Sequence, residues 1–132
     1  MKVGVFTALL AKLPLVDVLK KLAAHGITTV ELGTGNYPGG AHCDLAMLQD
    51  RTALREFKAL FDDHGVSISA LSCHGNPLHP NRVHAKHDQA VNKKSIQLAE
   101  KLGVPVVVDF SGCPGDSPAA KYPNWVDRKS VV

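Results

Sequence analysis

The sequence predicts an α/β fold made of parallel β/α units. Four apolar runs, each short enough to be a buried strand, cover residues 3–6, 27–32, 66–71 and 104–110. Helical patterns separate them, and three of the runs follow a helix-ending glycine, in HGITTVEL, HGVSISAL and LGVPVVVDF. This alternation of strand and helix favours a parallel sheet with right-handed crossovers.

The first helix is predicted between Pro14 and Gly26. Pro14 suits the first helical position, and Gly26 follows the end of the pattern. Lys20 and Lys21 fall on the face opposite the apolar residues, which recur at spacings of three and four: Leu15, Val18, Leu19 and Leu22. The pattern therefore predicts an amphipathic helix.

Two further helices follow the same design. The second is predicted to begin at Asp50, a good N-cap residue, and to stop at His64 and Gly65. The third is predicted from about Lys86 to Gly103. Their apolar positions are Leu54, Phe57 and Phe61 in the second helix, and Val91, Leu98, Ala99 and Leu102 in the third.

The connections are unequal in length, and this points to the functional edge of the sheet. Each helix-to-strand turn takes only a few residues, whereas long loops cover residues 33–49, 72–85 and everything after 111. Parallel α/β folds bind ligands at the carboxyl ends of their strands. The long loops are therefore expected to surround a binding site.

The number of strands suggests half of a barrel. A complete (β/α)8 barrel needs about 250 residues, and this chain has 132. Either the fold is a small open α/β sheet, or residues 1–125 form the front half of a barrel with open edges. Residues 126–132, which lack helical periodicity, are predicted to be a non-native or disordered tail.

Composition and charge exclude several classes of function. The net charge of +3 is small and its basic residues are dispersed, which gives no support to nucleic-acid or membrane-surface binding. No segment approaches the ~20 apolar residues of a membrane helix. The three cysteines, Cys43, Cys73 and Cys113, have no framework spacing, so a reducing, cytoplasmic setting is expected.

Three polar side chains at strand ends are the main candidates for chemistry. Glu31 closes the second predicted strand, His74 follows the third, and Asp109 closes the fourth, so all three are expected to project toward one mouth. Two carboxylates and an imidazole are adequate for proton transfer or for binding a divalent metal. The alternative is that Glu31 and Asp109 pair with basic side chains or cap backbone amides.

The other histidines and the remaining loop residues give weaker signals. His79 precedes Pro80 and need not face the same point as His74, while His84 and His87 are expected to be solvated. The segment GTGNYPGG has Pro38 at a required glycine position, which argues against a nucleotide loop. The three cysteines are expected to be small buried residues rather than a metal cluster. In the last loop two aromatic residues could wall a small polar ligand: Tyr122 and Trp125.

Three segments together resemble a known family. VELGTGNYPGGAHCD, ALSCHGNPLHP and VVVDFSGCPGD, in this order, look like the N-terminal half of the sugar phosphate isomerase/epimerase group, the xylose isomerase-like TIM barrels. The resemblance implies a (β/α)8 barrel, a bound divalent metal (Mn, Mg, Co or Zn) and proton transfer next to a carbonyl of a sugar or polyol. One branch of relatives instead hydrolyses phosphodiesters with zinc, as the apurinic endonucleases do.

The resemblance also assigns roles by position. Glu31 and His74 match residues of the catalytic pocket, and His74 is the one residue that matches a metal ligand, in the endonuclease branch. The other matches are expected to bind substrate: Asn76, His79, Asp109 and Trp125. Because the family's main metal ligands follow strands five to eight, this chain is expected to bind no metal and to be inactive alone.

Three expectations about function follow. The first is a metal-assisted isomerase or epimerase domain for a small sugar or polyol. The second is a non-catalytic open α/β module that binds a small ligand or a partner chain, and the third is an endonuclease-like zinc hydrolase. Since a half barrel leaves its first and fourth strands unpaired, the chain is also expected to associate with itself through the exposed half-barrel surface.

Overall fold

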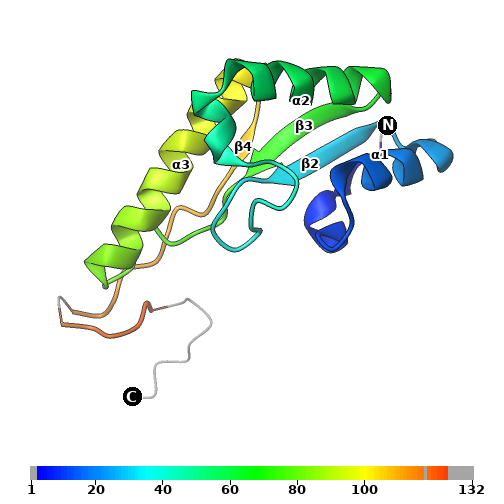
Figure 1. Cartoon of the computed structure of the whole chain (residues 1–132). Helices are drawn as coiled ribbons and strands as arrows, with labels where there is room; N and C mark the ends of the chain where they lie inside the picture. The colour runs from blue at the N-terminus through cyan, green and yellow to red at the C-terminus, as the bar shows by residue number, and fades with distance from the viewer. Residues whose placement is uncertain (1–2, 118, 125–132) are drawn as a thin grey trace.

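A parallel β-sheet flanked by helices organises the structure (Figure 1). The structure is a computed structural model that describes residues 3–117 and 119–124, and within these residues the sheet has four strands in the order β1-β2-β3-β4. The strands are β1 (Val5–Phe6), β2 (Thr29–Gly33), β3 (Ser67–Ser72) and β4 (Val107–Val108), and every neighbouring pair is parallel. The α/β class, the parallel sheet and its open edges are thus as predicted.

The helices alternate with the strands along the chain. The α-helices are α1 (Leu15–Ala24), α2 (Arg51–Asp63) and α3 (Arg82–Leu102), and two short 3-10 helices, η1 (Thr7–Leu10) and η2 (Leu45–Gln49), lie in the loops. None of these helices is both long enough and apolar enough to cross a membrane.

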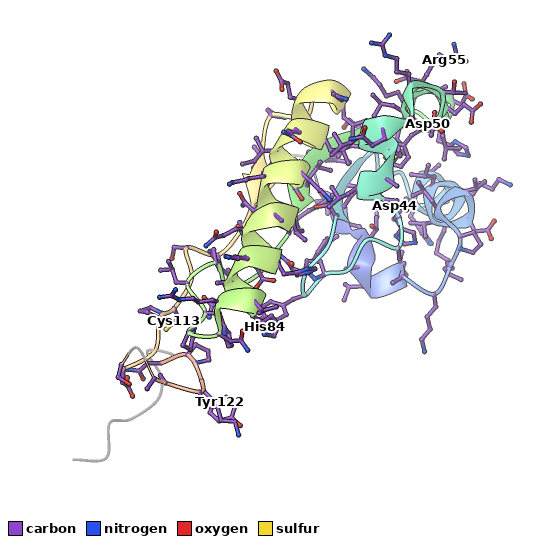
Figure 2. The ribbon with its side chains drawn as sticks, turned by 60° about the vertical axis from the view of Figure 1, so that its left-hand side comes forward. Asp44, Asp50, Arg55, His84, Cys113 and Tyr122 are labelled. Carbon is purple, nitrogen blue, oxygen red and sulfur yellow. The ribbon has the colours of Figure 1, made fainter. Side chains whose placement is uncertain are left out.

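The helix starts show how local sequence sets the boundaries. As predicted, Asp50 caps α2, and its carboxylate accepts hydrogen bonds from the backbone N–H groups of Thr52 and Ala53 at 2.9 and 3.0 Å (Figure 2). Pro14 is the N-cap of α1 rather than its first helical residue. Helix α3 begins four residues earlier than predicted because Asn81 caps it, accepting from the N–H of Val83 at 2.9 Å.

The edge strands are shorter than their apolar runs. Residues 104–110 were predicted to be a strand, but only Val107 and Val108 pair with β3. The first of these residues, Val104, is buried in the core beside α3 instead of continuing the ladder. Pro105 contributes to this shortening because it has no N–H to donate.

All the α-helices pack against one face of the sheet. The core takes Val30 and Leu32 from β2 and Leu71 from β3. The helix side chains buried against them are Val18, Leu19 and Leu22 of α1, Phe61 of α2, and Leu98, Ala99 and Leu102 of α3. The predicted periodicity of each helix therefore identified its buried face.

Strand alternation leaves the second face of the sheet for other residues. Since Val30 and Leu32 point to the helices, Glu31 between them points to the opposite face, which we call the inner face. Val107 packs on the core, so Val106 and Val108 also belong to the inner face. A register shift between Val30 and Glu31 places Glu31 beside Ala70 of β3.

Candidate functional site

Glu31 lies on the inner face near the carboxyl ends of β2 and β3. Its Oε1 accepts a hydrogen bond from the hydroxyl of Ser72, the last residue of β3. The side chain is half-buried, and its register partner on the other side is Phe6 of β1. The carboxylate is thus held by a neighbouring strand while it remains open to the inner face.

His74 lies between the aromatic side chains of Phe6 in β1 and of Phe110, which follows β4. Its ring stacks on that of Phe110 with centroids 4.7 Å apart and 22° between the planes, and it meets Phe6 edge-on at 6.4 Å. Among the described residues, no side chain or backbone group hydrogen-bonds to its ring nitrogens. The packing therefore orients the imidazole and leaves its nitrogens available.

Asp109 points away from Glu31 and His74. Its Oδ1 accepts from the backbone N–H groups of Gly75 at 3.3 Å and Phe110 at 2.8 Å, and its Oδ2 accepts from the side-chain amide of Asn92 on α3. The expectation that all three strand-end side chains face one mouth is therefore wrong for Asp109. The carboxylate caps backbone amides and ties β4 to α3, which is the alternative that the sequence left open.

Asn76 is a fully buried link between two loops. Its Oδ1 accepts from the N–H groups of Cys113 at 2.8 Å and Leu78 at 3.2 Å, and its Nδ2 donates to the carbonyl of Cys113 at 2.9 Å. Its own N–H donates to the carboxylate of Asp88 at 2.6 Å. Because the side chain is fully buried and both of its polar atoms are bonded to the chain, its placement indicates a positioning role.

The other three histidines singled out from the sequence, His79, His84 and His87, lie near the start of α3 or within it. His79 Nδ1 accepts from the N–H of Asn81 at 3.0 Å, and its ring lies 4.8 Å from that of His84. His79 lines a separate open pocket of about 450 Å³ together with Arg82 and Asp116. His84 and His87 are exposed, as predicted.

Of the two aromatic residues in the last loop, the structure describes Tyr122. Figure 2 shows Tyr122 at the same end of the molecule as Cys113 and His84, and its side chain is exposed. Trp125, predicted to bind substrate, and the predicted tail at 126–132 lie outside the described residues. Both remain predictions.

The glycine-rich loop after β2 supports the backbone of the candidate site. The side-chain amide of Asn36, which has a positive φ of 55°, donates to the carbonyl of Cys73 at 2.8 Å. The N–H of Tyr37 donates to the carbonyl of His74 at 2.9 Å. A Cβ on Gly33 would lie 2.6 Å from the carbonyl oxygen of Gly39, so the close return of this loop requires glycine. The loop therefore shapes the mouth, as predicted, by holding the residues around His74.

A buried hydroxyl pair was missed by the sequence reasoning. Thr34 Oγ1 and Ser95 Oγ lie 2.7 Å apart, and the Thr34 hydroxyl also donates to the carbonyl of Ser72 at 3.3 Å. This pair joins the end of β2 to α3 beneath the candidate site. Only its position directly after a strand could have singled out Thr34, because serine and threonine are common in exposed loops.

A comparison with models of protein families identifies the family of this chain. Residues 19–131 match a family model described as a xylose isomerase-like TIM barrel. The chain is a member of this family. The resemblance seen in the three loop segments is thereby confirmed, and the sheet with its covering helices is part of a TIM barrel.

Individual relatives of this TIM-barrel family agree with that assignment. An uncharacterized protein of Bacillus subtilis (strain 168), YfiH, is 35% identical over 127 residues, which cover 96% of this chain and 40% of YfiH. Two solved structures share the fold: SMc04130 of Sinorhizobium meliloti 1021 (TM-score 0.56, 19% identity, 89% of this chain and 39% of that one) and a D-psicose 3-epimerase determined with D-fructose (TM-score 0.55, 12% identity, 83% and 37%). The chain thus spans about two fifths of the length of these relatives.

The residues described here do not build the divalent-metal site expected of this barrel family. Within residues 3–117 and 119–124, no three His, Cys, Asp or Glu side chains lie together as metal ligands. Glu31 and His74 provide two donors, whereas zinc takes about four ligands and magnesium about six. Cys43, Cys73 and Cys113 are free and buried, as expected of packing residues.

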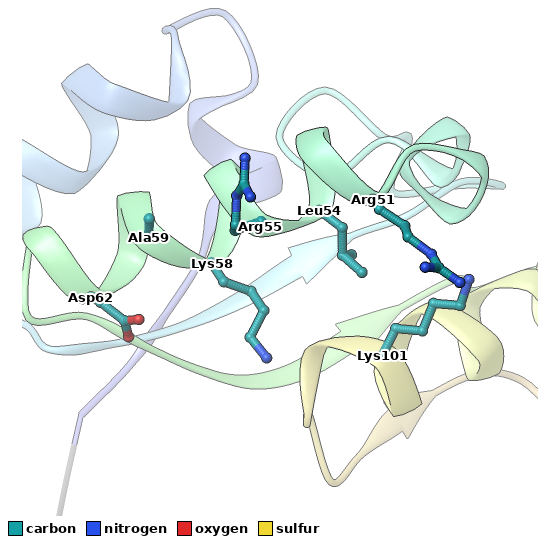
Figure 3. A pocket seen from close by; sticks show the side chains of 7 residues that line it. All are labelled: Arg51, Leu54, Arg55, Lys58, Ala59, Asp62 and Lys101. Atoms are coloured by element: carbon teal, nitrogen blue, oxygen red, sulfur yellow. The ribbon is translucent and has the colours of Figure 1, made fainter.

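A pocket on the outer side of the barrel segment lies apart from the candidate site. A pocket of about 410 Å³ lies between α2 and α3, with Lys101 opposite the side chains of α2 (Figure 3). It is lined by Arg51, Leu54, Arg55, Lys58, Ala59, Asp62 and Lys101. None of these is a predicted site residue, and the pocket contains no imidazole.

Burial makes the Cys43 thiol a test of the packing under the glycine-rich loop. Burial, and after it the Asp44 carboxylate, raises the pKa of Cys43 from 9.0 to about 12. The unfolded thiol ionises above pH 9 while the folded thiol stays protonated, so its contribution to stability is complete below pH 9 and is lost as the pH rises toward 12.

Near neutral pH, we expect iodoacetamide to modify Cys43 only after unfolding in urea, as measured by peptide mass spectrometry. Equal rates in the folded and unfolded chain would contradict this packing.

Proposed function

We propose that this chain forms one part of a sugar isomerase or epimerase barrel, in which Glu31 and His74 move a proton next to a substrate carbonyl. The observation that carries the proposal is that both side chains lie on the inner face at the carboxyl ends of neighbouring strands, where such barrels bind ligands. The sugar epimerase among the structural neighbours supports the substrate class, a small sugar or polyol.

Glu31 and His74 are suited to act as a general acid and a general base. A carboxylate and an imidazole are the side chains most used for proton transfer, and positioned groups of this kind contribute about 100- to 10,000-fold in rate. The Ser72 hydroxyl fixes the Glu31 carboxylate, and the rings of Phe6 and Phe110 fix the His74 imidazole. We assign no step to a metal, because the described residues supply too few ligands to hold one.

The proposal is tested in a chimera of YfiH in which the matched segment is replaced by this chain, so that the barrel is complete. We expect the chimera, with Mn²⁺, Mg²⁺, Co²⁺ or Zn²⁺ supplied, to exchange solvent deuterium into a ketose such as D-fructose at the carbon next to the carbonyl. Proton NMR measures this exchange. His74→Ala and Glu31→Gln should each lower its rate by about 100-fold or more.

A control substitution at another histidine distinguishes the loss of a catalytic group from a general effect of replacing a histidine. His84→Ala removes an exposed imidazole on α3 and should leave the exchange rate unchanged. No exchange with any ketose tested would overturn the proposal. An unchanged rate in His74→Ala and Glu31→Gln would instead show that the activity resides in other residues.

A further inference from the structure

The fold gathers basic side chains that are dispersed in the sequence. The pocket of about 410 Å³ between α2 and α3, which we call the outer pocket, is lined by four cationic side chains and by one carboxylate, that of Asp62. The cations are Arg51, Arg55, Lys58 and Lys101. Three of them lie on α2 and the fourth lies near the end of α3, so only the packing of the two helices brings them together.

The cations of the outer pocket converge without partners of opposite charge. Arg51 and Lys101 are directed toward one another across the gap between the helices, and Lys58 extends into the same gap (Figure 3). Lys101 Nζ donates to the carbonyl of Leu48 at 2.9 Å, which holds its charge beside the start of α2. In the part of the chain that the structure describes, none of the four cations forms an ion pair. The pocket therefore has an excess of positive charge.

Helix stability does not account for this arrangement. Arg51 is the first residue of α2, where the positive end of the helix dipole disfavours a cation. Arg51 and Arg55 are also four residues apart on one helix, a spacing at which like charges repel each other. The nearby carboxylate of Asp50 is engaged by the backbone N–H groups of Thr52 and Ala53. A bound anion would offset these unfavourable interactions.

We propose that the outer pocket binds a small organic molecule that carries two phosphate groups. In this complex one phosphate group lies between Arg51 and Lys101, and the other lies beside Lys58. The backbone positions of Arg51 and Lys58 are about 10 Å apart along α2, because seven residues of helix separate them. The proposal goes beyond the proposed chemistry and does not depend on it, since neither Glu31 nor His74 lines this pocket.

Charge and size favour phosphate groups on a small molecule over other anions. A phosphate group carries nearly two negative charges at neutral pH, so one group balances both Arg51 and Lys101, whereas a carboxylate balances one of them. The planar guanidinium of Arg51 can bind two phosphate oxygens at once. Leu54 and Ala59 add apolar surface for the organic part. The volume of about 410 Å³ is that of a small-molecule site rather than of an extended groove for a macromolecule.

Completion of the barrel leaves the outer pocket open. In a (β/α)8 barrel each strand is followed by a helix, and the helices form a ring around the strands. Helices α2 and α3 follow one another in the chain, so further β/α units join beyond β1 and β4 and not between these two helices. The remainder of a barrel is therefore not the occupant of this pocket.

Isothermal titration calorimetry of the chain at low ionic strength tests the proposal, with fructose 1,6-bisphosphate as the probe. We expect one probe molecule to bind per chain. Arg51→Gln and Lys101→Gln should each weaken binding by about tenfold or more, because each removes charged hydrogen bonds to a phosphate group. Lys21→Gln makes the same change at an exposed position of α1 and should leave the affinity unchanged. If Lys101→Gln proves unfolded by circular dichroism, Lys58→Gln replaces it.

Further titrations distinguish this occupant from others. An excess of D-fructose should not compete with the probe, because the pocket is separate from the proposed sugar site. A folded YfiH chimera should bind the probe with the same affinity as the chain. The proposal is overturned if the probe does not bind, if Arg51→Gln and Lys101→Gln bind it as the unchanged chain does, or if the folded chimera loses binding. Tighter binding of a glutamate-rich peptide at the same residues also overturns it, and would identify a docking surface for acidic peptides.

Discussion

Replacing Leu71 with alanine is expected to lower the free energy of unfolding by about 2–5 kcal/mol. Leu71 is fully buried at the centre of the sheet, where it pairs with Leu32 of β2 and Val107 of β4 beneath the helices. Its truncation leaves a cavity that strands and helices on all sides cannot fill. Urea denaturation followed by circular dichroism measures the loss, which appears as a lower midpoint.

Leu9→Ala is the matched control for this prediction. It removes the same atoms from a side chain that is 85% exposed in η1, so the expected change is within about 0.5 kcal/mol. If both variants lost the same stability, the helices would not be packed on the face of the sheet that contains Leu71.

Asn76→Ala is expected to cost on the order of 3 kcal/mol, because it leaves several buried polar groups without partners. The groups are the N–H and carbonyl of Cys113 and the N–H of Leu78. The substitution also unties the segment after β4 from the loop after β3. We therefore expect limited proteolysis to cut between residues 111 and 124 faster in the variant, in addition to the lower midpoint in urea.

Asn81→Ala gives the comparison for Asn76. It makes the same change at an exposed N-cap of α3, where the expected cost is about 1 kcal/mol. It should not alter cleavage between residues 111 and 124. Equal costs for the two variants, or unchanged cleavage in Asn76→Ala, would contradict the linking role of Asn76.

The sequence predicted the parallel sheet and the helix faces because both depend on local periodicity. Residues 27–32 and 66–71 form strands close to the predicted bounds, and Asp50 caps α2 as its residue type suggested. The same patterns could not fix the face of Asp109. A shift of one residue in register moves a side chain to the other face, and in the run 104–110 only two residues pair.

The sequence singled out some residues of the candidate site but did not indicate that others are buried. Glu31 lies within a predicted strand and His74 follows the next one, and the structure places both near the carboxyl ends of these strands. Asn76 and Thr34 are ordinary loop residues in sequence, and only the fold reveals that they are buried. Burial of a polar side chain depends on distant segments, such as Cys113 for Asn76 and Ser95 for Thr34.

The division of β2 between two faces has an evolutionary consequence. Val30 and Leu32 serve the packing of the helices, while Glu31 between them faces the mouth. The residue at position 31 can therefore change while its neighbours preserve the packing of the helices. Two solved structures that share only 12–19% of their residues with this chain keep its fold.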